Sequence, residues 1–326
     1  MPPKIRGMTA NSTTQKSAVR RFTLMVSGED ALDSNPGQDN PPRGLPQERF
    51  LLGDQLPIAP LLLLGQSNLA VNPNEIIACL QPVHLHATRD HLILMAQSQI
   101  DLTAEESARL LEVALPYIEE DFQHPVLFQG QRDWLIPAGP FASLATHTID
   151  QAHGRNIDWW MPRDTHENGI AKLWRKLQNE IQMLWHIDAV NEAREQGGLP
   201  TMNSLWISGI GKLEDIRTPA LFQNVTQIYG EHSLLAGLAK YLSIPCQSEI
   251  DFSKLENGFA WLAQPKSAWD QLKTALLHGV LDEIEIIDFP NAQPRCRIFK
   301  AKDLHKKSWA FWKKSEPFTW QEIISS

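Results

Sequence analysis

Residues 178–211, QNEIQMLWHIDAVNEAREQGGLPTMNSLWISGIG, join an expected helix to an expected strand and decide the fold class. Gly197 and Gly198 supply the left-handed stop that commonly ends a helix, and Pro200 prevents the helix from resuming. A strand is expected over residues 204–207, and residues 208–211 close it with a Gly-x-Gly turn. A helix followed directly by a strand is the unit from which α/β folds are built.

The alternation of helix and strand continues to the C-terminus. Helices are expected over residues 170–195, within 219–242 and over 267–277, and strands over 204–207, 259–262 and 284–287. This order predicts βα crossover units and a partly parallel sheet.

The first half of the chain has a different pattern, with strand pairs close in sequence. Strands are expected over residues 21–26 and in hairpins at 83–95 and 127–136, and a helix over 103–115 opens with the capping box Thr103–Glu106. We therefore expect an α/β protein, α+β in its first half, with a mixed sheet flanked by helices. The expected organisation is a disordered tail (1–18), a short strand and flexible linker (19–47), an α+β region (48–165) and an α/β region (166–326), the last two packed as one compact unit.

Composition excludes several classes of function. The 326 residues carry a formal charge of −8, which argues against a general nucleic-acid surface. The three cysteines are widely spaced and show no metal-finger pattern, so a reducing cytoplasm is expected and no cofactor is indicated. The longest apolar run, residues 56–64, is short and contains two prolines, so no membrane span is expected.

Polar residues interrupt the apolar face of the expected helix over residues 170–195. An advance of about 100° per residue places Glu180, Asn191 and Arg194 on the same arc as Leu173, Leu184 and Ile187. Burying such groups without partners is costly. They therefore form either a buried polar network or the wall of a pocket for an anionic or polar ligand. A kink near Asp188 would rotate Asn191 and Arg194.

Further candidate site residues lie at loops and strand ends. Arg155, Asn156 and Asp158 belong to a polar, tryptophan-rich loop, and loops commonly carry function. Asn203 and Ser204 precede the strand, and Gly209 and Gly211 follow it, where α/β folds often bind ligands. A separate group, His84, His86 and His91, could meet across a hairpin, but no matching carboxylate accompanies these weak candidates for metal ligands.

Several of these segments resemble the RpfE-type regulatory proteins, a family of uncharacterised bacterial proteins. The resemblance rests on residues 178–211 together with PVHLHATRDHLIL (82–94), LTAEESARLL (102–111), GRNIDWWMPR (154–163) and SWAFWKK (308–314). It implies a cytoplasmic protein with a regulatory or ligand-sensing role.

The central stretch is also similar to a segment of archaeal-type cofactor-independent phosphoglycerate mutases. The matching residues are Asn191, Arg194, Pro200, Asn203, Gly209 and Gly211. Those mutases need two metal ions and a nucleophile beside an Asp-Gly motif, and this sequence contains no Asp-Gly. The resemblance therefore does not carry the catalytic machinery with it.

Three functional hypotheses follow. The first is a regulatory or ligand-sensing protein without identifiable catalytic machinery, which would bind an anionic small molecule or a protein partner. The second is a mutase-related enzyme acting on phosphorylated small molecules. The third is a partner-binding structural protein whose exposed tryptophans, among the eleven in the chain, form the interface.

Overall fold

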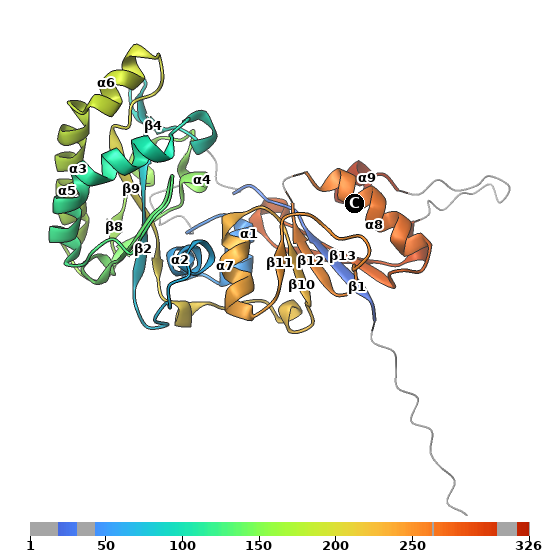
Figure 1. Ribbon diagram of the computed structural model, residues 1–326. Helices are drawn as coiled ribbons and strands as arrows, with labels where there is room; N and C mark the ends of the chain where they lie inside the picture. Colours follow the sequence, from blue (N-terminus) through green and yellow to red (C-terminus); the bar gives the residue numbers. More distant parts are fainter. Residues whose placement is uncertain (1–18, 31–42, 263, 305–317, 326) are drawn as a thin grey trace, which may run out of the picture.

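The computed structural model describes residues 19–30, 43–262, 264–304 and 318–325. The expected disordered tail (1–18), most of the expected linker and the motif at residues 308–314 lie outside the described residues. The described chain stacks helices and sheets alternately (Figure 1). The order is helices α3 (Ala104–Phe122) and α5 (Ile170–His186), a four-stranded sheet, helices α2 (Ile58–Gln66) and α7 (Ser233–Leu242), a six-stranded sheet, and helices α8 (Pro265–Leu277) and α9 (Trp320–Ser325). The expected α/β class with helices flanking a mixed sheet is confirmed.

The six-stranded sheet, here sheet A, is built from both ends of the chain. Its strands are β1 (Arg21–Met25), β10 (Gln227–Tyr229), β11 (Cys246–Gln247), β12 (Gly258–Trp261), β13 (Glu283–Asp288) and β14 (Arg295–Phe299), in the order β11-β10-β12-β1-β13-β14. All neighbours are parallel except β13 and β14. The short N-terminal strand is thus central, with Thr23 paired to Phe259 on one side and to Glu285 on the other.

The four-stranded sheet, here sheet B, is antiparallel. It contains β2 (Ile77–Val83), β5 (Phe128–Gln129), β6 (Trp134–Pro137) and β9 (Ser204–Gly211), in the order β5-β6-β2-β9. Strand β9 pairs with β2 along almost its whole length, so the boundary expected between residues 165 and 166 falls inside the part of the chain that builds this sheet. The hairpin of β3 (Leu85–Ala87) and β4 (Leu92–Leu94) forms where the sequence predicts one.

Large aromatic side chains bind the outer helices to the sheets. Helices α3 (Ala104–Phe122) and α5 (Ile170–His186) cover sheet B through a core that includes Trp134, Trp174 and Trp185. Helix α3 has the predicted capping box, in which Glu106 N–H donates to Thr103 Oγ1 and Thr103 N–H donates to Glu106 Oε2. On sheet A, α8 (Pro265–Leu277) and α9 (Trp320–Ser325) pack Trp269 and Trp320 together.

Shorter elements complete the described chain. They are α1 (Pro46–Leu52), α4 (Ile149–Ala152), α6 (Ala189–Gln196), β7 (Leu144–Ala145), β8 (Arg163–Asp164) and 3-10 turns at Gln97–Gln99, Gly139–Phe141, Ile157–Trp159, Leu213–Asp215, Ala220–Gln223, Pro290–Ala292 and Ala301–Leu304. Within the described residues, no helix has the length and apolar character needed to cross a bilayer.

The helix between the two sheets, α2 (Ile58–Gln66), is the apolar run of residues 56–64. It packs on sheet B and, through α7 (Ser233–Leu242), on sheet A, so most of it is buried. Pro60 is tolerated because it lies in the first turn, where its missing N–H would have no helical partner. A Cβ on Gly65 would lie 2.7 Å from the backbone nitrogen of Gly237, so the two helices cross at backbone contact.

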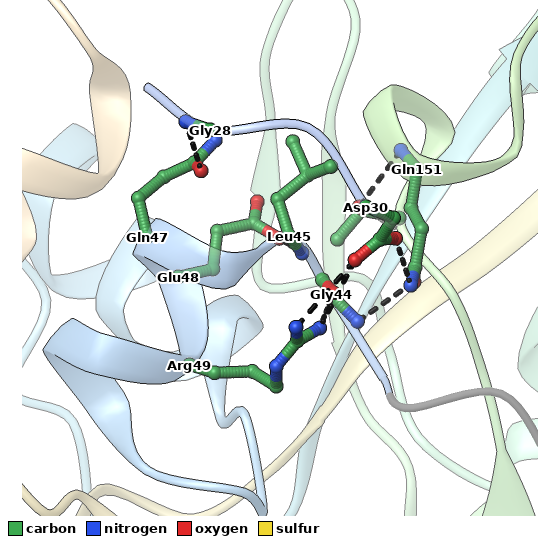
Figure 2. A network of polar contacts seen from close by, with 9 residues as sticks. Gly28, Asp30, Gly44, Leu45, Gln47, Glu48, Arg49 and Gln151 are labelled. Atoms are coloured by element: carbon green, nitrogen blue, oxygen red, sulfur yellow. Dashed lines mark hydrogen bonds and ion pairs between the residues drawn. The ribbon is translucent and has the colours of Figure 1, made fainter. Parts of the chain in front are cut away.

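A buried polar network joins the loop after β1, helix α1 and helix α4 (Figure 2). Gln151 donates to Asp30 at 2.9 Å and accepts from the backbone of Gly44 at 2.7 Å. Arg49 lies 3.4 Å from Asp30 and also donates to the carbonyl of Gly44. Burial raises the pKa of Glu48, which accepts from Leu45 N–H at 2.6 Å, to about 8. Part of the expected linker therefore belongs to the packed structure.

The crossing of α2 and α7 predicts a sharp sensitivity to one added methyl group. In Gly237→Ala, the new Cβ would overlap the backbone carbonyl of Leu61, which cannot move without shifting α2. We expect the free energy of unfolding to fall by at least about 2 kcal/mol. The control is Gly139→Ala, because a Cβ there meets nothing within 4 Å. Denaturant unfolding checks both variants, and equal stabilities would contradict the close crossing.

Glu48 predicts a pH-dependent stability. Its pKa in the folded protein is above that of an exposed glutamate, so the folded state holds an extra proton and stability falls as pH rises from about 4.5 to about 8. Glu48→Gln resembles the protonated side chain. We expect it to remove this slope and to exceed the wild type by on the order of a few kcal/mol at pH 8. Unfolding curves between pH 5 and 8 test this, and a stability gap that does not change with pH would contradict it.

Candidate functional site

A large cavity opens at the carboxyl edge of sheet A. Strand β10 continues through α7 to β11, whereas β12 continues through α8 to β13 on the other side of β1. Helices α7 and α8 cover opposite faces of the sheet (Figure 1). The chain therefore leaves β10 and β12 in opposite directions, which opens a crevice between the two strand ends.

This cavity, here the carboxyl-edge pocket, has a volume of about 730 Å³, within the range of small-molecule sites. The loops after four parallel strands and the first turns of α8 contribute its lining. The lining residues are Ser27, Glu231, His232, Ser248, Glu249, Ile250, Phe252, Trp261, Leu262, Gln264, Ser267, Ala268 and Gln271.

Two stacked rings form one wall of the carboxyl-edge pocket. The rings of His232 and Trp261 lie 4.1 Å apart at an interplanar angle of 23°. Trp261 Nε1–H donates to Ser27 Oγ at 2.9 Å, which fixes the indole. His232 Nδ1 accepts from the backbone N–H of Leu234 at 3.3 Å, so the neutral ring carries its proton on Nε2. Burial lowers the pKa of His232, although Asp150 opposes the effect, and a neutral ring is favoured.

The pocket is acidic. Glu231 and Glu249 are exposed carboxylates in its lining, and no lysine or arginine is among the lining residues. With a neutral His232, the side chains of the lining carry a formal charge of −2. The polar groups can both donate and accept hydrogen bonds, since hydroxyls come from serines and amides from glutamines.

The predicted candidates Asn191 and Arg194 belong to a buried hydrogen-bond network, in which Nη2 of Arg194 has no partner among the described residues. The single helix expected over residues 170–195 is wrong: α5 ends at His186, and Asp188 caps α6 by accepting from Val190 N–H. Asn191 donates to the carbonyls of Trp185 and Met202 and accepts from Met202 N–H, all within 2.8 Å. It thereby closes the corner between the two helices.

Arg194 is held from three directions. Its Nε donates to the carbonyl of Pro200 at 2.7 Å, and its Nη1 donates to the carbonyl of Asp101 and to the carboxylate of Glu106 at 2.8–2.9 Å. The carboxylate of Glu106 also accepts from Thr103 N–H in the capping box of α3, so it joins the start of α3 to Arg194. Of the two interpretations of this segment, the contacts favour the buried network.

The remaining residues of the same segment make separate hydrogen bonds. Glu180 is only half-buried and lies 3.4 Å from Lys176. Its expected place on the buried arc is wrong, because α5 buries the face with Trp174, Leu177 and Ile181 instead. Asn203 exchanges two hydrogen bonds with the backbone of Leu85, and Ser204 accepts from Gln178 at 2.9 Å. Asn191 and Asn203 do line a small cavity of about 320 Å³.

Gly209 and Gly211 serve packing in this structure. The expected turn is wrong, because β9 runs on to Gly211 through a bulge in which Gly209 has φ +63°. A Cβ on Gly211 would lie 2.7 Å from Pro57, and one on Gly209 would lie 2.9 Å from the backbone nitrogen of Ala59. The glycines let the start of α2 approach the sheet.

The polar loop before β8 uses its side chains locally. Arg155 lies over the ring of Trp160, 5.1 Å from its centroid. Asn156 accepts from the backbone N–H of Asp158 at 3.0 Å, and the Asp158 side chain is exposed. These three predicted candidates lie outside the lining of the carboxyl-edge pocket.

The three histidines of the hairpin are not gathered at one point. His84 and His86 have ring centroids 6.1 Å apart, and His91 is exposed near the turn. His84 Nδ1 lies 2.8 Å from the carbonyl oxygen of Thr201, and burial lowers the pKa of His84. In the described ranges, no three His, Cys, Asp or Glu side chains are grouped so as to hold a metal ion.

Sequence reasoning missed the carboxyl-edge pocket because it missed two short strands. A helical region is expected within residues 219–242, and α7 lies there, but the same range also holds β10, which brings Glu231 and His232 to the sheet edge. Strand β11 has two residues, too few for a visible alternation. The one local signal is the sequence Gln-Ile-Tyr before Gly230, a β-forming pair followed by a turn residue.

Comparisons with known proteins give distant similarities only. No protein-family model matches the chain, so the resemblance to RpfE-type proteins has no support from a family model, and no curated protein matches either. Among solved structures, PH0037 protein from Pyrococcus horikoshii is 13% identical with a TM-score of 0.39, covering 83% of this chain and 82% of its own. The cofactor-independent phosphoglycerate mutase from Thermoplasma acidophilum is 11% identical with a TM-score of 0.36, covering 86% and 90%. At these scores neither structure indicates a function for this chain.

This buried network predicts that Asn191 is important for stability. Asn191→Ala would leave the N–H and the carbonyl of Met202 without the side chain that bonds them, so we expect a loss of about 2–3 kcal/mol in the free energy of unfolding. Glu180→Ala is the control on the same segment and should change stability by less than about 0.5 kcal/mol. Chemical denaturation measures both. A larger loss for Glu180→Ala would contradict the network.

Proposed function

We propose that this protein binds a small organic molecule in the carboxyl-edge pocket and that binding serves a regulatory or sensing role. The observation that carries the proposal is the position of a 730 Å³ cavity at the point where the chain leaves β10 and β12 in opposite directions. Ligands of open α/β sheets bind in such crevices. The resemblance to RpfE-type proteins supports the regulatory part and a cytoplasmic location.

The lining of the pocket has the mixture that small-molecule sites use. Phe252, Leu262 and the Trp261 ring offer apolar surface, while the hydroxyls and amides can fix the orientation of a ligand. The Nε2–H of His232 adds one directed donor, which makes no hydrogen bond to a described residue. A ligand that filled this space would complete hydrogen bonds that the described residues leave open.

The mutase-related alternative receives less support from the same lining. Enzymes acting on phosphorylated molecules neutralise phosphate with basic side chains or metal ions. No lysine or arginine lines the carboxyl-edge pocket, and its two carboxylates would repel a phosphate.

The partner-binding alternative required exposed tryptophans. Of the tryptophans in the described residues, all but Trp159 are buried, so they do not form such an interface. Trp309 and Trp312 lie outside the described residues.

A compound panel with a blocked pocket tests the proposal. We expect at least one compound of a broad metabolite panel to raise the midpoint of thermal unfolding by about 2–4 °C at saturating concentration. Ser267→Trp fills the pocket from an exposed position of α8 and should abolish the shift. Its control is Lys266→Trp, because Lys266 is the exposed neighbour that does not line the pocket. Shifts that survive Ser267→Trp would place binding elsewhere and contradict the proposal.

A further inference from the structure

Two carboxylates of the carboxyl-edge pocket follow the ends of adjacent strands. Tyr229 of β10 pairs with Gln247 of β11, and Gly230 N–H donates to the carbonyl of Gln247 at 2.9 Å. Glu231 lies two residues after Tyr229, and Glu249 lies two residues after Gln247. Both glutamates lie in the bends that follow these strand ends, and both line the same cavity.

Neither glutamate is neutralised within the described chain. Among the described residues, no salt bridge involves Glu231 or Glu249, although both line the same cavity. A further carboxylate, Asp150 of α4, raises the pKa of His232 and so opposes the effect of burial. The two charged side chains of the lining are therefore both acidic, and no lysine or arginine of the lining offsets them.

The helix N-termini at the pocket are too weak to reverse this charge. Each carries the equivalent of about half a positive charge, so α7 and α8 together contribute about +1 against two full carboxylate charges. Their N–H groups are also partly used or missing. Leu234 N–H donates to His232, and Pro265 at the start of α8 has no N–H.

Apolar and aromatic groups line the same cavity as the carboxylates. Phe252, Ile250 and Leu262 can cover an apolar body, and the Trp261 ring is fixed by its bond to Ser27. Carboxylates beside aromatic rings favour an ammonium group, which gains from ion pairing and from the negative face of a ring. The carboxylates and the negative faces of the rings would repel an anion.

We infer that the carboxyl-edge pocket takes an organic cation, an amine carried on an aromatic or aliphatic body, with Glu231 and Glu249 pairing its ammonium group. The inference rests on the proposed function, since it assigns the ligand class of the same pocket. It differs from the expectation of an anionic or polar ligand, which was drawn from Asn191 and Arg194; in the structure Arg194 is paired with Glu106.

Three probes of similar shape and different charge test the ligand class. Tryptamine is cationic at neutral pH, tryptophol is neutral and indoleacetate is anionic. Calorimetric titration of the full chain at low ionic strength should show tryptamine binding at least about fivefold more tightly than tryptophol, and indoleacetate weakest. Added salt should reduce the preference for tryptamine because the carboxylates are exposed.

Variants assign the preference to the two glutamates. In the double variant Glu231→Gln, Glu249→Gln, tryptamine should bind no better than tryptophol, while tryptophol affinity should stay within about twofold of the wild type. Glu105→Gln, which removes an exposed carboxylate on α3, should leave all three affinities unchanged.

Indoleacetate binding as tight as tryptamine, no detectable binding of tryptamine, or an unchanged preference in the double variant would each overturn the cation inference. The metabolite panel tests the proposed function separately from the ligand class. If panel compounds bind and Ser267→Trp abolishes their binding, the pocket is a binding site and only the ligand class is wrong. If no compound of any charge depends on Ser267, the proposed function fails as well.

Discussion

The backbone contact between α2 and α7 is the constraint on which the rest of the structure depends. Both helices lie between the two sheets, and Gly65 and Gly237 allow them to cross with no side chain in between. The same close approach recurs where α2 meets β9, at Gly209 and Gly211. Because interiors pack at near-crystalline density, a methyl group at these crossings would force the neighbouring backbone to shift.

This packing also sets up the carboxyl edge of sheet A. Helix α7 is held against α2 on one face of the sheet, so α8 covers the other face, and the chain leaves β10 and β12 in opposite directions. The pocket between those strand ends follows from the topology. Its chemistry follows from the loop residues, of which His232 is oriented by the start of α7 and Trp261 by Ser27.

Local sequence signals predicted much of the fold but little of the site. The capping box at Thr103, the hairpin around residues 83–95 and the strand over residues 284–287 all formed, because each depends on neighbouring residues. Periodicity carried over residues 170–195 failed at Asp188, where a side chain caps a new helix. Because the helix breaks there, Asn191 contacts Met202, and Arg194 contacts Pro200 and Glu106. The phase of a single helix cannot predict these contacts.

The sequence by itself determined the α/β class, the order of most helices and strands, and the need to pair the polar residues on an apolar helix face, since burial without partners is costly. Only the tertiary structure decided what pairs them. It also placed β1 at the centre of sheet A between strands more than 230 residues away, and it placed Glu231 and Glu249 in the lining of one pocket. Strands of two or three residues carry almost no periodicity, so their neighbours in the sheet define them.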